Sequence, residues 1–470
     1  MNKYNTLFSN TIIFAIGSFG SRLITFFLVP LYTNVLTATQ FGTADLVQTI
    51  AILIVPVASL AIHDSVLRFG LSKDANHGTV LLNALIIFFC GTIFVFLMTP
   101  LFVYNETLSP WRIYVALMVI VNMMSNIMFA YVKSKDKNKE YSLISIIFTF
   151  TLAVLNIVLL VFCKLEVKGY LYANIIAHVV AAGSLWISCH AFQDIHESKF
   201  DKELLKQMLA YSTPLIVNNL SWWILNSSDR VMIEWYLSAA ALGLYAAASK
   251  IPALLSIITA IFSQAWTISS VKDYDTDKDK IFYMNIFKYY SILLTFAAAA
   301  IMLILKDFMK IYVGPEFVSS WKYIPFLLLG TVFYSYSAFF GAIYGAAKKN
   351  ISVAITTFIA AIINIVINII LIPRLGIMGA VISTAIAYTA IGLFRMIDSQ
   401  RFFAFQINYL KFAVNALIIL TQSILLTMDW YGYVISIACI IVLVLINRKD
   451  IYDLILYLKI MFKKEKNKIS

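Results

Sequence analysis

The sequence contains few charged residues, cysteines and histidines. Only 13% of its 470 residues are Asp, Glu, Lys or Arg, roughly half the share found in soluble globular domains, and the mean hydropathy is +0.85. No polar block is large enough for a soluble domain, which argues against an extramembrane enzyme. The four cysteines form no CxxC pair, so we expect small buried side chains rather than a disulfide or metal framework. There is no Walker motif, which argues against direct use of ATP.

Long apolar runs recur from Thr11 almost to Asn447, each about as long as a bilayer crossing. This pattern predicts an all-α polytopic membrane protein with about fourteen transmembrane helices. The first run lacks a small-residue cleavage pattern, so we interpret it as a retained helix rather than a signal peptide. The expected spans are residues 10–35, 44–70, 79–104, 111–132, 142–163, 170–192, 211–237, 243–271, 283–305, 322–345, 351–372, 377–398, 411–428 and 431–447.

The positive charges are concentrated in alternate loops and in the basic tail. With a cytoplasmic N-terminus, roughly 25 Lys and Arg lie inside and about 7 outside, the asymmetry that the positive-inside rule requires. The net charge of +12 therefore indicates membrane topology rather than nucleic-acid binding. An even number of helices places both termini in the cytoplasm, so we expect a multi-pass membrane protein.

Three short patterns recur in the same order at nearly constant spacing. LTATQFG at Leu36 matches LSAAALG at Leu237, an offset of 201 residues. Two further matches have offsets of 208 and 210: LNIVLL with INIVIN, and Gly169-x-x-x-Ala173-x-x-x-Ala177 with Gly379-x-x-x-Ser383-x-x-x-Ala387. Small-residue composition at helix contacts is the alternative origin of such matches.

The repeat predicts two six-helix lobes, residues 1–197 and 198–406, followed by residues 407–470 as a helix pair with a basic amphipathic tail on the inner leaflet. Copies with six helices each have the same orientation, so an axis along the membrane normal should relate them. We expect the two pseudo-symmetric lobes to surround a central cavity.

Polar side chains form stripes on the first two helices of each predicted lobe. Arg22 lies near mid-membrane, where a charge costs about 2.5–3.5 kcal/mol, and this cost indicates a function. We expect Arg22, Arg230 and Lys250 to offer fixed positive charge to a phosphate-bearing ligand, because Arg makes paired hydrogen bonds to phosphate oxygens. The full set of predicted substrate-binding residues is Ser18, Arg22, Thr25, Gln48, Asn219, Trp223, Asn226, Arg230, Tyr245, Ser249 and Lys250.

Ion pairing is the competing interpretation for several of these charges. Arg230 could pair with Glu234 one turn later, and Asp64 with Arg68, as local bridges or gating pairs. Arg22 could instead pair with Asp64 or Glu234. Lys288, near the inner end of its helix, is typical of a lysine that extends to lipid head groups.

The motifs resemble a known family. SRLITFFLVPLYTNVLTATQFG, from Ser21 to Gly42, is similar to the first-helix signature of Wzx-type lipid-linked oligosaccharide flippases of the multidrug/oligosaccharidyl-lipid/polysaccharide exporter superfamily. LRFGLSKD and NIVINIILIPRLGIMGA, which begins at Asn364, also resemble that family. The resemblance implies a two-lobed alternating-access transporter that moves undecaprenyl-pyrophosphate-linked oligosaccharide units from the inner to the outer leaflet, for capsule, O-antigen or exopolysaccharide synthesis.

Two other transport functions stay open. A flippase for the peptidoglycan lipid precursor meets the same physical demands, and a cation-coupled drug antiporter of the same superfamily would need an acid deep in a lobe, where the first helix offers Arg22. We expect no enzyme activity and no cofactor; a coupling ion, proton or sodium, is not identified. Expected partners are the polyprenyl-pyrophosphate-linked oligosaccharide, membrane lipids and other polysaccharide-assembly membrane proteins.

Overall fold

The computed structural model describes residues 24, 26–72, 74–272, 277–401, 406–430 and 432–469. Contacts divide the chain into two compact units, Gly20–Ala246 and Ala247–Ser470, which we call the N-terminal and C-terminal units. The predicted lobes rest on the internal repeat rather than on contacts, so their boundary at residues 197 and 198 stays a prediction.

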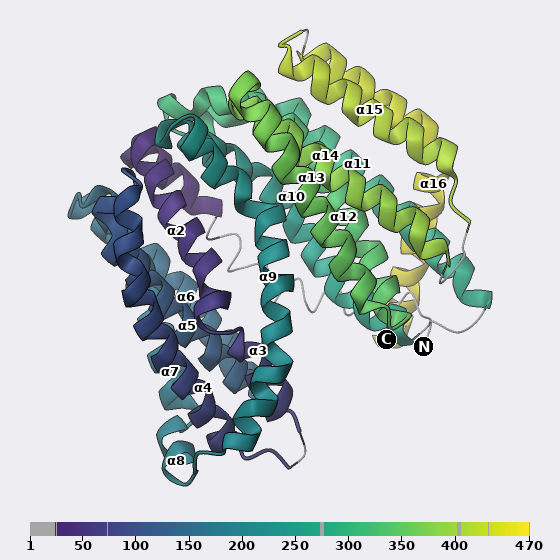
Figure 1. Ribbon diagram of the computed structural model, residues 1–470. Helices are drawn as coiled ribbons and strands as arrows, with labels where there is room; N and C mark the ends of the chain where they lie inside the picture. Colours follow the sequence, from purple (N-terminus) through teal and green to yellow (C-terminus); the bar gives the residue numbers. More distant parts are fainter. Residues whose placement is uncertain are drawn as a thin grey trace. The chain divides into compact units, whose positions relative to one another are not determined.

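The N-terminal unit is a bundle of helices with α5 at its centre (Figure 1), where it contacts α2, α3, α4 and α7. Its apolar face explains this position, because Val115, Met123 and Ile127 are completely buried. The α-helices are α2 (Ala38–Ala58), α3 (Ile62–Gly70), α4 (His77–Met98), α5 (Arg112–Ser134), α6 (Asn138–Asn156), α7 (Glu166–Ser188), α8 (Ala191–His196), α9 (Lys202–Tyr236) and the start of α10 (Ala239–Lys272).

The C-terminal unit has its core on α12, which packs against α14 along its length. An aromatic group joins α10, α11 and α12: the Trp266 ring stacks on Phe339 with centroids 4.5 Å apart and donates its indole N–H to the Phe339 carbonyl at 3.0 Å. The helices are the rest of α10, α11 (Asp277–Tyr312), α12 (Ile324–Ala346), α13 (Asn350–Leu375), α14 (Ile377–Asp398), α15 (Tyr409–Thr427) and α16 (Gly432–Ile469).

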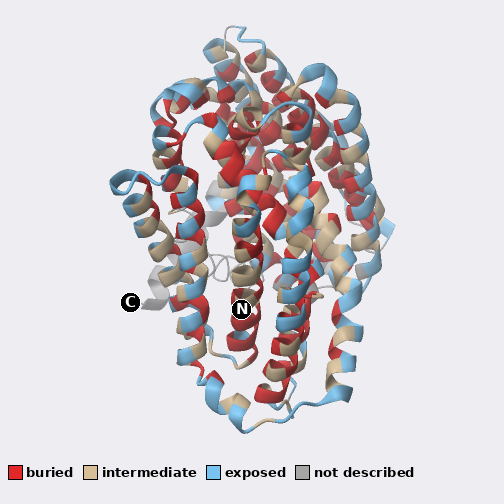
Figure 2. Cartoon of the chain, turned by 60° about the vertical axis from the view of Figure 1, so that its left-hand side comes forward, coloured by how far each residue is buried: buried red, intermediate tan, exposed pale blue. Residues whose placement is uncertain are grey.

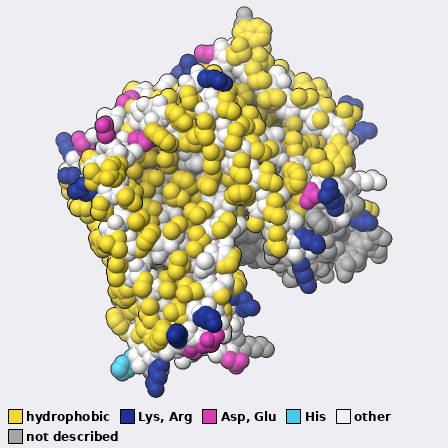
Figure 3. Space-filling view, viewed as in Figure 1, with side chains coloured by type: hydrophobic (Ala, Val, Ile, Leu, Met, Phe, Trp, Pro, Cys, Tyr) yellow, Lys and Arg dark blue, Asp and Glu magenta, His cyan; other side chains and the backbone are white. Residues whose placement is uncertain are grey.

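Eleven of the described helical segments are long and apolar enough to cross a membrane. Together with α9 and α16 they match every predicted span after the first, and the described part of the first contains an apolar helix at Phe26–Val35. Figure 3 shows hydrophobic side chains over most of the visible face and charged side chains gathered toward its edges. The all-α polytopic fold is therefore confirmed.

The expectation that all four cysteines are buried is wrong, because the outer faces of the helices are apolar. Figure 2 shows buried residues where helices of a unit face one another and exposed residues on their outer sides. Cys189 is buried as expected, but Cys90 and Cys163 are exposed. A cysteine is apolar enough to lie on a surface that faces lipid, so burial in protein is not required.

The predicted helix over residues 44–70 is two helices, α2 and α3. Leu60 and Ala61 have φ of 50° and 51°, in the left-handed region that a right-handed helix cannot contain. Pro56 lies one turn earlier, inside α2, and cannot donate a backbone hydrogen bond. A second boundary also differs, because the span predicted at 431–447 and the amphipathic tail form one continuous helix, α16.

Corresponding glycines make corresponding contacts in the two units. A Cβ on Gly169 of α7 would lie 3.1 Å from the Leu159 carbonyl oxygen, and a Cβ on Gly379 of α14 would lie 2.3 Å from that of Leu371. In each unit the glycine lets a helix approach the backbone of the helix before it. This agreement supports the repeat that the sequence indicates.

A polar cluster at one end of the N-terminal unit joins α5 to α8. Lys135 Nζ donates a hydrogen bond to Asp194 Oδ2 at 2.6 Å, and the Tyr131 hydroxyl donates to the same oxygen. Burial opposes ionisation of Asp194, but the hydrogen bonds from Lys135 and Tyr131 outweigh it and hold the pKa of this carboxyl below its usual range.

This lowered pKa predicts a pH-dependent contribution to stability. The Asp194 carboxylate stabilises the fold above its ordinary pKa of 3.8, and this contribution is lost as the pH falls through the lower folded pKa. We expect Asp194→Asn to lower the thermal midpoint at pH 7 by about 1 °C, the effect of about 1 kcal/mol on a chain of 470 residues, and to abolish this acid step. Thermal unfolding of the purified protein from pH 7 to pH 3 checks this, and an equal acid step in both proteins would contradict it.

Candidate functional site

Arg230, one of the predicted substrate contacts, forms an ion pair inside the N-terminal unit. Its Nε lies 3.0 Å from Asp45 Oδ2, and the two side chains are 20% and 7% exposed. Arg230 lies about two turns before the end of α9, and Asp45 about two turns after the start of α2. The pair therefore joins α2 to α9 well inside both helices, where an unpaired charge is costly.

The polar stripe of α9 faces α2 at a second position. Trp223 lies about two turns before Arg230, and its indole N–H donates to the Thr49 carbonyl at 3.1 Å. Thr49 follows Asp45 by one turn, so the two contacts run antiparallel along the same pair of helices. At these two positions, the side chains of the predicted polar stripe therefore bond to another helix.

Two tyrosines extend this group of bonds to α7 and α10. The Tyr245 hydroxyl, at the start of α10, donates to Asp229 Oδ2, and Asp229 is 3% exposed. The Tyr170 hydroxyl on α7 donates to Gln48 Oε1 at 2.7 Å. Gln48 and Tyr245, both predicted substrate contacts, therefore have partners inside the N-terminal unit.

The two copies of the repeated LTATQFG-like motif contact each other directly. A Cβ on Gly42 would lie 1.8 Å from the Ala239 carbonyl oxygen, and a Cβ on Gly243 would lie 2.0 Å from that of Ala38. Ala38 and Ala239 are equivalent positions of the repeat, as are Gly42 and Gly243, so the contact is reciprocal. We call this contact the glycine crossing; it holds the starts of α2 and α10 together.

The structure describes only some of the remaining predicted contacts. Ser18, Arg22 and Thr25 lie outside the described residues. Ser249 and Lys250 lie in the C-terminal unit, on α10, and are partly exposed. On α9, Asn219 is partly exposed, while the Asn226 side chain is exposed and donates to the Trp222 carbonyl at 2.6 Å. That Arg22, Arg230 and Lys250 share a cavity stays a prediction.

Asp64 and Glu234, two of the predicted gating residues, have neighbours other than those expected. Asp64 Oδ1 lies 3.7 Å from His63 Nε2, and Arg68 is exposed on α3. Glu234 Oε2 accepts a hydrogen bond from Asn105 Nδ2 at 3.4 Å. Arg230 has a partner on another helix, Asp45 of α2, and its pairing with Glu234 stays a prediction.

Asp45 and Arg395 are not among the residues predicted from the sequence. Asp45 is an acid in an otherwise apolar run, and this rarity was the available signal. Arg395 of α14 is 1% exposed, but its position in the sequence beside a polar loop gave no sign of this burial. Four neutral oxygens surround its guanidinium at 2.8–3.2 Å: the hydroxyls of Thr356 and Thr357 and the carbonyls of Ser337 and Val353. Arg395 therefore joins α12, α13 and α14.

The charge of the site differs from a purely cationic surface. When ionised, Asp45 and Asp229 together carry two negative charges, against the single positive charge of Arg230. Among the described residues, no group of three or more His, Cys, Asp or Glu is arranged to hold a metal ion. The arrangement offers a buried acid beside a fixed cation, which can hold an anion, bind a small cation or exchange a proton.

Two solved structures share the fold of this chain. A structure of the lipid II flippase MurJ in an inward closed conformation matches with a TM-score of 0.70 and 15% identity, covering 94% of this chain and 100% of the other. An inward-facing multidrug resistance MATE family transporter of the MOP superfamily matches with a TM-score of 0.64 and 15% identity, covering 80% and 97%. The chain has the fold of this class of two-lobed, multi-pass membrane transporters.

The sequence comparisons identify the family. The model described as polysaccharide biosynthesis protein matches residues 7–268, and the MatE model matches residues 214–370. A protein of the Lsg locus of Haemophilus influenzae is 22% identical over 343 residues, covering 69% of this chain and 81% of the relative. The chain belongs to the polysaccharide biosynthesis protein family, and the family resemblance seen in the Ser21–Gly42 run is confirmed.

Proposed function

We propose that the protein is a flippase that moves undecaprenyl-pyrophosphate-linked oligosaccharide repeat units from the inner to the outer leaflet of the bacterial plasma membrane by alternating access. The observation that carries the proposal is the match of residues 7–268 to the polysaccharide biosynthesis protein family. The fold that this chain shares over 94% of its length with the lipid II flippase MurJ supports it.

Fixed cations have the chemistry that such a substrate requires. Arg230 supplies a planar guanidinium, which can bind phosphate oxygens in pairs. The ion pair with Asp45 holds this cation in a partly buried position, 20% exposed, until an anion competes for it. Arg22 and Lys250 are proposed to provide the further positive charge that a pyrophosphate needs, and the amides Asn219 and Asn226 to hydrogen-bond the sugars.

The membrane potential can contribute to the driving force. A pyrophosphate that carries about two negative charges and moves outward across an inside-negative potential gains roughly 4–5 kcal/mol per 100 mV. This amount favours export without nucleotide hydrolysis. The products that this transport would serve are capsule, O-antigen or exopolysaccharide.

Inactivation of the gene in its own bacterium tests the function. We expect surface polysaccharide to disappear and undecaprenyl-pyrophosphate-linked repeat units to accumulate on the inner side of the membrane. The unchanged protein should restore export. The Arg22→Ala variant should be inserted in the membrane and abundant, but it should not restore export. Quantification of lipid-linked sugars by mass spectrometry and of surface polysaccharide by gel analysis measures both effects. Normal export in the inactivated strain would refute the proposal.

A second candidate is cation-coupled transport of drugs, and Asp45 is the observation that favours it. This buried acid on α2, 5% exposed, is the type of residue that an antiporter uses to exchange a proton or sodium ion. The same strain distinguishes the two: loss of drug efflux with normal surface polysaccharide would support the antiporter. Accumulation of the peptidoglycan precursor instead would support the lipid-precursor flippase.

A further inference from the structure

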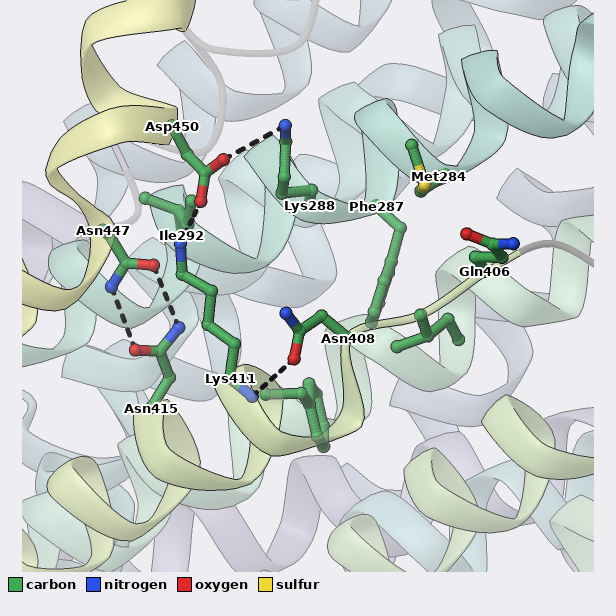
Figure 4. A pocket seen from close by; sticks show the side chains of 12 residues that line it. Met284, Phe287, Lys288, Ile292, Gln406, Asn408, Lys411, Asn415, Asn447 and Asp450 are labelled. Carbon is green, nitrogen blue, oxygen red and sulfur yellow. Dashed lines mark hydrogen bonds and ion pairs between the residues drawn. The ribbon is translucent and has the colours of Figure 1, made fainter.

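A pocket of about 400 Å³ lies between α11, α15 and α16 in the C-terminal unit (Figure 4). Lys288 comes from α11, Lys411 from the first turn of α15 and Asp450 from α16. Asn415 and Asn447 also face the pocket but hydrogen-bond each other at 2.9 and 3.3 Å, so they hold α15 against α16. The three charged side chains are therefore the chemically distinctive part of the pocket.

The pocket has more positive than negative charge. Lys288 Nζ lies 3.2 Å from Asp450 Oδ1, and Lys411 Nζ donates to Oδ2 of the same carboxylate. Figure 4 shows the two lysines reaching this carboxylate from different helices. One carboxylate between two ammonium groups leaves a net charge of +1, while the lysine side chains are 30% and 23% exposed and the Asp450 side chain 15%. The start of α15, which adjoins the pocket, adds partial positive charge.

The position of the pocket indicates a ligand at the membrane surface. The apolar span Tyr409–Thr427 begins within a turn of Lys411, and Asp450 lies one turn after Ile446, where the apolar part of α16 ends. The pocket lining also contains apolar side chains, among them Phe287 and Phe412. A ligand that suits this pocket has one negative charge joined to an apolar body. The predicted topology places that end of the helices at the inner leaflet.

We propose that this pocket binds the phosphodiester head group of an anionic phospholipid such as phosphatidylglycerol. The phosphate oxygens lie between the ammonium groups of Lys288 and Lys411 and compete with Asp450, and the adjoining acyl chain packs against Phe287 and Phe412. A phosphodiester carries a single negative charge, which matches the charge excess of the pocket, whereas inorganic phosphate carries more charge and lacks the apolar body. The proposal does not depend on the transported substrate.

Native mass spectrometry of the full-length protein in detergent, with added phosphatidylglycerol or phosphatidylcholine, tests this site. We expect preferential retention of phosphatidylglycerol, and a loss of about five-fold in its affinity for each of Lys288→Gln and Lys411→Gln, since a basic residue near a membrane surface contributes about 1 kcal/mol. Asp450→Asn should act in the opposite direction and raise the affinity about five-fold, because it removes the internal competitor. Lys288→Gln leaves the Lys411–Asp450 bond in place, so the pocket should remain folded.

Lys306→Gln is the matched control, because Lys306 lies on the same helix, far from the pocket, and pairs with Asp429 at 2.7 Å. It should bind phosphatidylglycerol like the unchanged protein. A loss of phosphatidylglycerol affinity in Asp450→Asn would show that the three charges only link the helices, and it would overturn the proposal. Equal retention of the two lipids would also overturn it, as would displacement of phosphatidylglycerol by equimolar inorganic phosphate.

Discussion

Gly243→Ala is expected to destabilise the protein by about 3 kcal/mol and to abolish transport. The added Cβ would lie 2.0 Å from the Ala38 carbonyl oxygen, and the neighbouring atoms are backbone, which cannot move aside as a flexible side chain can. The starts of α2 and α10 must therefore separate. Overpacking commonly costs 1–3 kcal/mol, and contact with backbone places this substitution at the upper end of that range. Thermal unfolding and protein abundance in the membrane measure the loss.

Gly183→Ala is the matched control for the glycine crossing. Gly183 lies in α7 of the same unit, is exposed, and has no heavy atom within 4 Å of an added Cβ. The same change should there stabilise the helix by roughly 0.5–1 kcal/mol, since alanine loses less conformational entropy than glycine. Equal unfolding midpoints for the two variants would mean that the crossing tolerates a methyl group. Gly42→Ala should behave like Gly243→Ala because the contact is reciprocal.

Much of the fold could be predicted because the bilayer imposes one strong rule. A segment that crosses hydrocarbon must satisfy its backbone polar groups internally, so hydropathy alone indicates the helices. The break at Leu60 and Ala61 was not predicted, because no glycine marks the positive φ and Pro56 lies a turn earlier. The continuity of α16 past Asn447 was missed because a change from apolar to charged residues ends a span but does not end a helix.

The candidate site was harder to predict than the fold. Spacing identified Trp223 and Arg230 as one polar stripe, but the identity of the facing helix depends on tertiary packing. Asp45 was missed because its only sequence signal is a single acid in an apolar run. Hydrophobic periodicity shows which side chains share a face and cannot show whether that face meets water or another helix. The glycine crossing is an example: the sequence shows both copies of the motif, but it does not show that they contact each other.

Arg230→Gln is expected to abolish export of surface polysaccharide and to destabilise the protein by about 3–5 kcal/mol, because it leaves Asp45 as a buried carboxylate without this partner. Asp45→Asn should cost a similar amount by leaving the guanidinium without this carboxylate. The double variant Asp45→Asn/Arg230→Gln should regain most of the stability, since two amides of similar size can hydrogen-bond each other. Denaturation of the purified variants measures the coupling between the two positions.

Export by the double variant then separates a structural pair from a functional one. If the pair only joins α2 to α9, two neutral side chains that restore stability should also restore export. If the charge of Arg230 binds the substrate's phosphate, the double variant should be stable and abundant yet export less than about a tenth of the normal polysaccharide, the effect of losing about 1.4 kcal/mol or more of phosphate binding. We expect the second result. Lys310→Gln, which removes an exposed pair with Asp307 at 2.9 Å, should change neither stability nor export, because pairs exposed on both sides contribute little.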